Sequence, residues 1–126
     1  MKHQTREVLN KTFRFSVDTI RFTHSFPQNA VGWTLTRQVI RSATSVGANF
    51  REAQFGRSRA EFISKIHVAL QEASESLYWL EVIKAVEIGD VNSAQALIIE
   101  ANQLLSILAA IAKTSKQNNR NASRSL

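Results

Sequence analysis

The chain has 126 residues, a formal net charge of +6, 44% hydrophobic residues and no cysteine. A chain of this length fits one domain, which can bury roughly two-thirds of the surface that its unfolded state exposes. The lack of cysteine excludes a disulfide framework, a thiolate nucleophile and cysteine-based zinc or iron–sulfur sites.

The N-terminal residues MKHQTREVLNKTF lack the apolar segment of a signal peptide, and no apolar run approaches the ~18 residues that cross a bilayer. We therefore expect a cytoplasmic protein without a membrane partner. With four glycines, one proline and no alternating valine, isoleucine and threonine runs, the composition predicts an all-α fold.

Two helices are predicted in the first half of the chain. The first spans about residues 5–25 and ends before Pro27. Its apolar stripe is formed by Leu9, Phe13, Val17 and Ile20, with Phe15 and Phe22 on a neighbouring one. The second starts after Asn29, a plausible N-cap, and continues to about residue 54 until Gly56 interrupts it.

Two more helices are predicted in the second half. Ser58 and Glu61 form an S-x-x-E capping box, and the apolar series that follows covers a wide arc, which predicts a central helix. Gly89 ends that helix and Asp90 caps the fourth. We predict an antiparallel up-down-up-down four-helix bundle over residues 1–114 and a basic disordered tail over residues 115–126.

The positive charge is unevenly distributed along the chain. Residues 1–57 have a net charge of +6, residues 58–112 of −4 and residues 113–126 of +4. Such asymmetry favours an anionic partner or head-to-tail contact between subunits.

The arginines of the second helix and the turn after it are the first candidates for that partner. Arg37, Arg51, Arg57 and Arg59 would form a cationic strip able to follow a nucleic-acid backbone. The alternative is that they pair with acidic groups of the antiparallel third helix. We predict this pairing for Arg41, with Glu72 and Glu75 as partners.

The tail residues Lys113, Lys116, Arg120 and Arg124 could bind RNA loosely, or could serve only as a solubilising terminus. Tyr78 and Trp79 lie beside Leu77 and Leu80, and four bulky residues in a row cannot all face one core. We therefore predict that Tyr78 and Trp79 contact another subunit rather than the core, with Trp33 and Phe55 as further candidates.

We expect no catalytic, metal or cofactor site. The three histidines form no i, i+4 pair and no Glu-x-x-His motif, and neither GxSxG nor GxxxxGK[ST] occurs. The carboxylates Glu72 and Glu75 could act as an acid–base pair, although ion pairing with arginine is the simpler interpretation.

The segment from Gln38 to Ile83 resembles the "four helix bundle protein" family. This family comprises proteins encoded within intervening sequences of bacterial 23S rRNA genes and relatives that include the accessory variability determinant of diversity-generating retroelements. The matching residues are Arg41, Ser42, Ala43, Ser45, Val46, Asn49, Gly56, Arg57, Ser58, Glu61, Phe62, Ala69, Glu72, Ala73, Glu75, Tyr78, Trp79, Leu80 and Glu81. The chain departs from the family at residues 50–55, where many members have small and acidic residues.

The resemblance implies a bundle, a homo-oligomer (ring-shaped pentamers occur in the family) and an association with RNA or a reverse-transcriptase-type protein. Our leading hypothesis is a non-enzymatic oligomer that binds RNA or a nucleic-acid-handling protein through a basic face. The alternative is a purely structural oligomer or a protein-interaction adapter.

Overall fold

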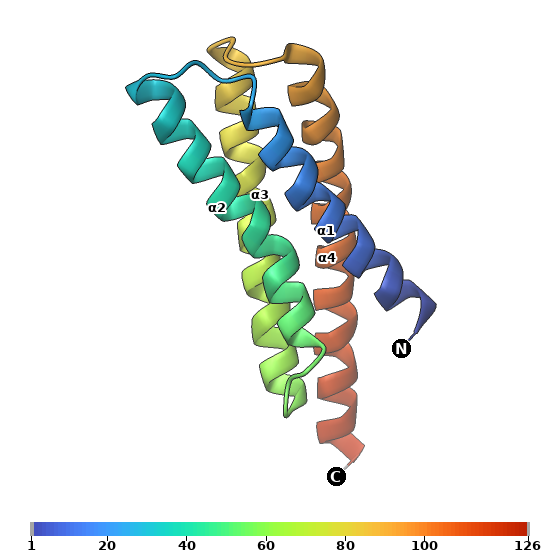
Figure 1. Cartoon of the computed structure of the whole chain (residues 1–126). Coiled ribbons are helices and arrows are strands. Elements are labelled where there is room, and N and C mark those ends of the chain that lie inside the picture. The colour runs from blue at the N-terminus through green and yellow to red at the C-terminus, as the bar shows by residue number, and fades with distance from the viewer. Residues whose placement is uncertain (1, 126) are drawn as a thin grey trace.

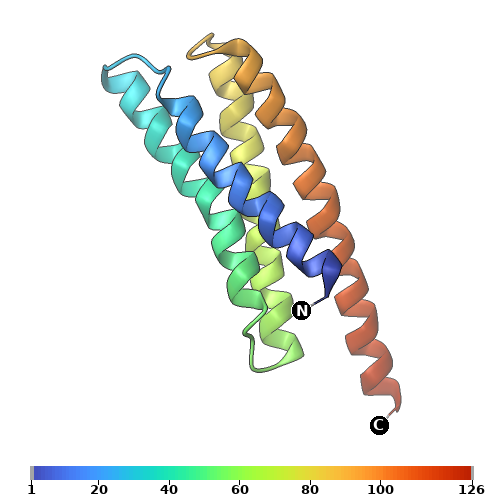
Figure 2. The same cartoon turned by 45° about the vertical axis from the view of Figure 1, so that its right-hand side comes forward.

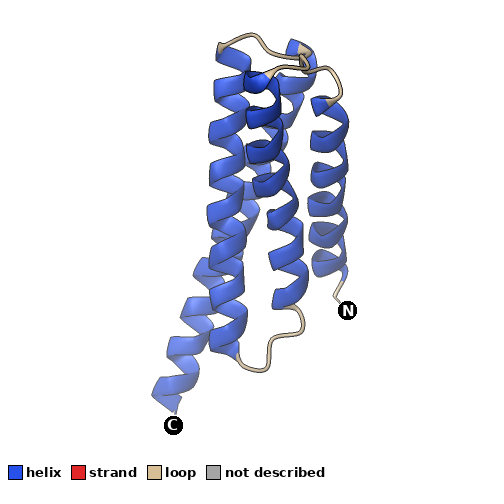
Figure 3. Cartoon of the chain, turned by 60° about the vertical axis from the view of Figure 1, so that its left-hand side comes forward, coloured by secondary structure: helices blue, strands red, loops and turns tan. Residues whose placement is uncertain are grey.

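The computed structural model describes residues 2–125, with the side chains of residues 2–121. It contains four helices, α1 (His3–Thr23), α2 (Ala30–Ala53), α3 (Arg59–Ala85) and α4 (Val91–Ser125). They form an all-α four-helix bundle, and the chain reverses direction at each of the three connections (Figures 1 and 3). Each helix packs on the helices next to it in sequence, and α1 also contacts α4.

The predicted helix starts are present in the structure. The Asn29 side chain accepts a hydrogen bond from the Gly32 amide (2.9 Å), and the Ser58 hydroxyl accepts one from the Glu61 amide (3.1 Å). Asp90 accepts from the Ser93 amide (2.9 Å). These side chains satisfy amides that have no partner within the first turn of a helix. The capping box is shifted by one residue, because the Glu61 carboxylate accepts from the amide of Arg57 rather than that of Ser58.

The end of α3 differs from the prediction. The helix stops at Ala85 rather than at Gly89, because Glu87 adopts a left-handed conformation (φ 58°). The amides of Glu87 and Ile88 then bond back to Lys84 and Ile83, an arrangement typical of a Schellman motif. Gly89 is also left-handed (φ 74°) and lies against the ring of Phe26, where a Cβ would have no room.

The core face of α1 also differs from the prediction. Phe13 is 59% exposed and Ile20 is 37% exposed, so the predicted stripe is wrong at both positions. The buried residues are Val8, Thr12, Phe15, Thr19, Phe22 and Thr23. An apolar pattern in the sequence does not include Thr12 and Thr19, so the pattern did not identify this face as buried. Thr12 is nevertheless compatible with burial because its hydroxyl donates to the Val8 carbonyl (2.8 Å).

Helix α3 packs between α2 and α4. Ile66, Ala69, Ala73, Leu80 and Ile83 of α3 are completely buried, which agrees with the central position predicted for this helix. The small residues Ser42 and Ala43 of α2 are also completely buried. Small side chains on both sides allow two helices to approach closely.

Helix α4 continues to Ser125, beyond Thr114, where the sequence predicted its end. Ala112 and Ser115 are buried, and no glycine or proline follows to interrupt the helix. The C-terminal part of α4 extends past the turn between α2 and α3 (Figures 1 and 2).

Helix α4 is more apolar on average than the short length of its uninterrupted apolar runs indicates. By length and composition alone, Val91–Asn121 would suffice to cross a membrane, with a mean hydropathy of 1.5 over an 18-residue window, of which 28% is buried. On the side that faces the bundle, Leu97, Ala101, Leu104 and Leu108 pack into the core.

Candidate nucleic-acid interface at one end of the bundle

Contacts between helices show which residues lie at the same level of the bundle. Thr12 of α1 lies against Gly47 of α2, where an added Cβ would approach the threonine to 3.3 Å. Lys65 of α3 pairs with Glu52 of α2 (2.8 Å). Residues 2–12, 46–67 and 104–121 therefore form one end of the bundle, where both chain termini also lie (Figures 1 and 2).

This end, which we call the cationic end, holds most of the positive charge. Its residues include ten lysines and arginines and three glutamates, a net charge of +7. The other residues among 2–121, namely 13–45 and 68–103, include five basic and seven acidic residues, a net charge of −2. The fold thus separates charge along the bundle axis.

Most of the predicted RNA-binding residues gather at the cationic end. Arg51, Arg57, Arg59, Lys113, Lys116 and Arg120 are exposed there. The side chain of Arg124 lies outside the described residues. Because α4 stays helical, Lys113, Lys116 and Arg120 follow one side of it at spacings of three and four residues.

The structure does not bring Arg37 together with this group. Arg37 is exposed but lies roughly 20 Å along α2 from Arg51, at 1.5 Å per residue. The predicted strip along α2 is also interrupted at Arg41, because its guanidinium pairs with carboxylates of α3.

Arg41 lies with the two carboxylates that the sequence predicts as its partners. Its guanidinium contacts Glu72 at 3.1 Å and also Glu75. The Glu75 carboxylate accepts a further hydrogen bond from the indole nitrogen of Trp79 (3.1 Å). The network joins α2 to α3, and it satisfies the two acidic groups considered above as an acid–base pair.

Sequence reasoning did not assign Lys2, Arg6 and Lys11 to the site. Lys2 precedes α1, whereas Arg6 and Lys11 belong to it. All three are exposed at the cationic end, because the N-terminus of α1 lies at the same end as the turn between α2 and α3. The sequence did show the positive charge of its first segment. That charge indicates a site only once the fold places the start of α1 next to the other cations.

The two aromatic residues predicted to contact another subunit, Tyr78 and Trp79, differ in their exposure. Tyr78 is 59% exposed, whereas Trp79 is half-buried and held by Glu75. The two rings pack edge to face, with centroids 5.2 Å apart. Trp33 and Phe55 are 54% and 78% exposed.

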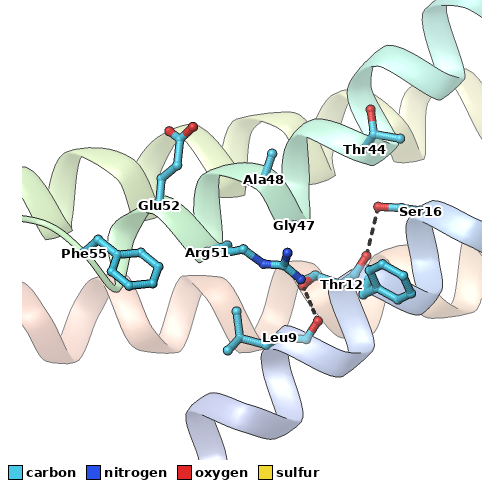
Figure 4. Close-up of a pocket in the computed structure, with 10 residues that line it drawn as sticks. Leu9, Thr12, Ser16, Thr44, Gly47, Ala48, Arg51, Glu52 and Phe55 are labelled. Carbon is cyan, nitrogen blue, oxygen red and sulfur yellow. Dashed lines mark hydrogen bonds between the residues drawn. The ribbon is translucent and has the colours of Figure 1, made fainter. Parts of the chain in front are cut away.

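A groove of about 490 Å³ lies between α1 and α2, next to the contact of Thr12 with Gly47 (Figure 4). Arg51 extends from α2 toward Leu9 and Thr12 of α1, and Phe55 lies beside it at the end of α2. Glu52 points to the other side of α2, where Lys65 pairs with it. The lining of the groove is mainly apolar, and its charged residues are Arg51 and Glu52.

Within residues 2–121 there is no group of three histidine, aspartate or glutamate side chains that could hold a metal ion. The Nε2 atom of His67 is buried without a hydrogen-bond partner. This single imidazole does not define a metal or catalytic site.

Glu100 of α4 is the acidic residue whose environment opposes ionisation. Burial raises its pKa, the nearby carboxylate of Asp18 raises it further, and Arg14 opposes the shift. One of its carboxylate oxygens is buried without a hydrogen-bond partner. A carboxyl with a raised folded-state pKa destabilises the fold when it ionises, and this penalty is absent below the unfolded-state pKa of about 4.3.

We therefore expect Glu100→Gln to raise the midpoint temperature of unfolding by about 2 °C at pH 7. The difference from the unmodified chain should shrink as the pH falls toward 4, because Glu100 is then protonated in both states. Thermal unfolding followed by circular dichroism across this range measures both effects. The exposed Glu81→Gln is the control, and an equal gain in that variant would contradict a local effect at Glu100.

The fold and its charge define a class of protein, an all-α four-helix bundle with one strongly cationic end. Residues 4–110 match the family model described as 23S rRNA-intervening sequence protein, and the chain belongs to this family.

A crystal structure from Bacteroides thetaiotaomicron, a protein of unknown function from the S23 ribosomal protein family, is similar with a TM-score of 0.78. The two chains are 32% identical over 84% of this chain and 98% of the other. The search of curated proteins found no match.

Proposed function

We propose that this chain is a non-enzymatic protein that binds RNA through its cationic end. The observation that supports the proposal is the net charge of +7 on residues 2–12, 46–67 and 104–121, against −2 on residues 13–45 and 68–103. Exposed cations gathered on one region attract a polyanion, and each phosphate contact releases counterions from it.

Internal ion pairs use little of this charge. The ion pairs found among the described residues of the cationic end join Lys65 to Glu52 and His3 to Glu7. Arg51, Arg57, Arg59, Lys113, Lys116 and Arg120 have no carboxylate within ion-pair distance among residues 2–121. They are therefore free to contact phosphates.

RNA is the first nucleic acid to test, because the family description refers to 23S rRNA. A nucleic-acid-handling protein, such as a reverse-transcriptase-type enzyme, is the second partner that this charge would suit. Self-association through the exposed Tyr78 face would bring several cationic ends together and increase avidity for a long RNA.

A salt titration tests the proposal. With about six phosphate contacts, the logarithm of the binding constant for single-stranded RNA should fall with the logarithm of salt concentration with a slope of about −4. Fluorescence anisotropy with a labelled oligoribonucleotide, from about 50 to 300 mM salt, measures the slope. Binding that is undetectable at about 50 mM would overturn the proposal, since phosphate contacts are strongest at low salt.

A structural oligomer is the second candidate function. It is favoured by the exposed side chains of Tyr78, Val86 and Val91, which are 59%, 54% and 55% exposed. Self-association without detectable RNA binding in the same titration would support this alternative.

A further inference from the structure

The groove between α1 and α2 is an apolar feature within the cationic end. Phe13 and Phe55 line it and are 59% and 78% exposed, so neither ring is used by the core. Gly47 and Ala48 are small residues of α2 that also line the groove. Its volume of about 490 Å³ lies within the range of about 300–1,000 Å³ that is typical of small-molecule sites.

We propose that this groove binds unpaired nucleotides of RNA, with bases stacked on Phe55 and Phe13 and the backbone contacted by Arg51. The inference rests on the proposed function, because it specifies which form of RNA the cationic end selects. Base stacking on aromatic rings combined with a positively charged groove is the physical basis of single-strand binding.

The charges around the groove fit this occupant. Arg51 lies in the groove, and Arg57 follows Phe55 by two residues at the exposed turn. The acidic neighbour Glu52 is neutralised by Lys65 at 2.8 Å. A bound strand would therefore meet Arg51 in the groove and Arg57 at the turn after it. Repulsion from the Glu52 carboxylate would be small.

An RNA duplex would not satisfy the same groove. In the A-form helix the bases are stacked on each other, and proteins reach mainly the phosphates and 2′-hydroxyls. The exposed rings of Phe13 and Phe55 would then stay without partners. The geometry consequently predicts preference for a single strand over a duplex of equal charge.

The test compares three labelled RNAs with the same total number of phosphates at about 100 mM salt: an unstructured strand, a perfect duplex of half its length, and a strand whose central nucleotides are abasic. We expect the unstructured strand to bind the unmodified protein most tightly. Phe55→Ala should weaken its binding about tenfold, the effect of losing one stacked base, and leave duplex binding unchanged. Phe13→Ala should act in the same direction.

Val31→Ala is the matched control, since Val31 is 57% exposed, about as exposed as Phe13, and lies at the start of α2, outside the cationic end. It should leave the affinity for all three RNAs unchanged. Because Phe55 is 78% exposed, its removal should not unfold the bundle, and circular dichroism checks this.

Unchanged single-strand binding in both phenylalanine variants would overturn the proposal that bases stack in the groove. RNA binding through phosphate contacts would be unaffected by that result. Equal affinity of the unmodified protein for the intact and abasic strands would overturn the stacking proposal in the same way. Loss of self-association without loss of RNA affinity would also overturn it, and would assign the groove to a second copy of the chain. Failure of every RNA to bind would instead overturn the proposed function.

Discussion

Replacing Arg57 and Arg59 together with glutamate should weaken RNA binding at about 100 mM salt by at least about a hundredfold. Both side chains are exposed at the cationic end, and the change removes two cations and adds two anions where the RNA is proposed to lie. For a single strand, the loss of two phosphate contacts should reduce the steepness of the salt dependence by about 1.4. Fluorescence anisotropy across a salt series measures both quantities.

The matched control is Arg21→Glu with Arg37→Glu, which changes the net charge by the same amount at the other end of the bundle. It should keep the slope of the salt dependence and lose little affinity. If both double variants lose affinity equally, net charge alone controls binding and the cationic end is not the site. Glutamate at the start of α3 is compatible with the helix dipole, so the first variant should remain folded.

Gly32→Ala should destabilise the fold by about 2–3 kcal/mol. An added Cβ would lie 2.0 Å from the carbonyl oxygen of Pro27, which belongs to the connection between α1 and α2. The intrinsic preference of a helix for alanine over glycine is about 1 kcal/mol and cannot compensate for this overlap. The carbonyl cannot easily move away, because Phe26 before it is buried. Thermal unfolding should show a midpoint lowered by about 10 °C.

Gly47→Ala is the control for this prediction. Its Cβ would meet Thr12 at 3.3 Å, a contact that a small shift relieves. The strain and the helix preference then nearly cancel, and the net change in stability should stay within about 1 kcal/mol. A similar loss in both variants would show that the Pro27 carbonyl is not the cause.

The starts of three helices could be predicted from the sequence because their signals are local. Asn29, Ser58 and Asp90 each accept a hydrogen bond from an amide three residues ahead, which requires no information from the rest of the chain. The pairing of Arg41 with Glu72 and Glu75 needed only the antiparallel order of α2 and α3 and an acidic excess on α3.

Two features could not be predicted in this way. The buried face of α1 includes Thr12 and Thr19, whose hydroxyl groups make the sequence look polar at positions that the core occupies. The end of α4 was misplaced because the residues after Thr114 have no apolar period, yet burial of Ser115 and the absence of a helix breaker extend the helix.

The sequence by itself determined that this protein is an all-helical bundle of one family, because apolar periodicity and caps act within a few residues. It also determined how many cations the chain contains, and the pairing of Arg41 followed from its register with α3. The tertiary structure decided where the remaining cations lie. By bringing the start of α1, the turn between α2 and α3 and the end of α4 to one end, it gathers ten basic residues there and leaves Arg37 apart. It also brings Phe13 and Phe55 to the lining of one groove, because only packing of α1 against α2 can form a groove from residues distant in sequence.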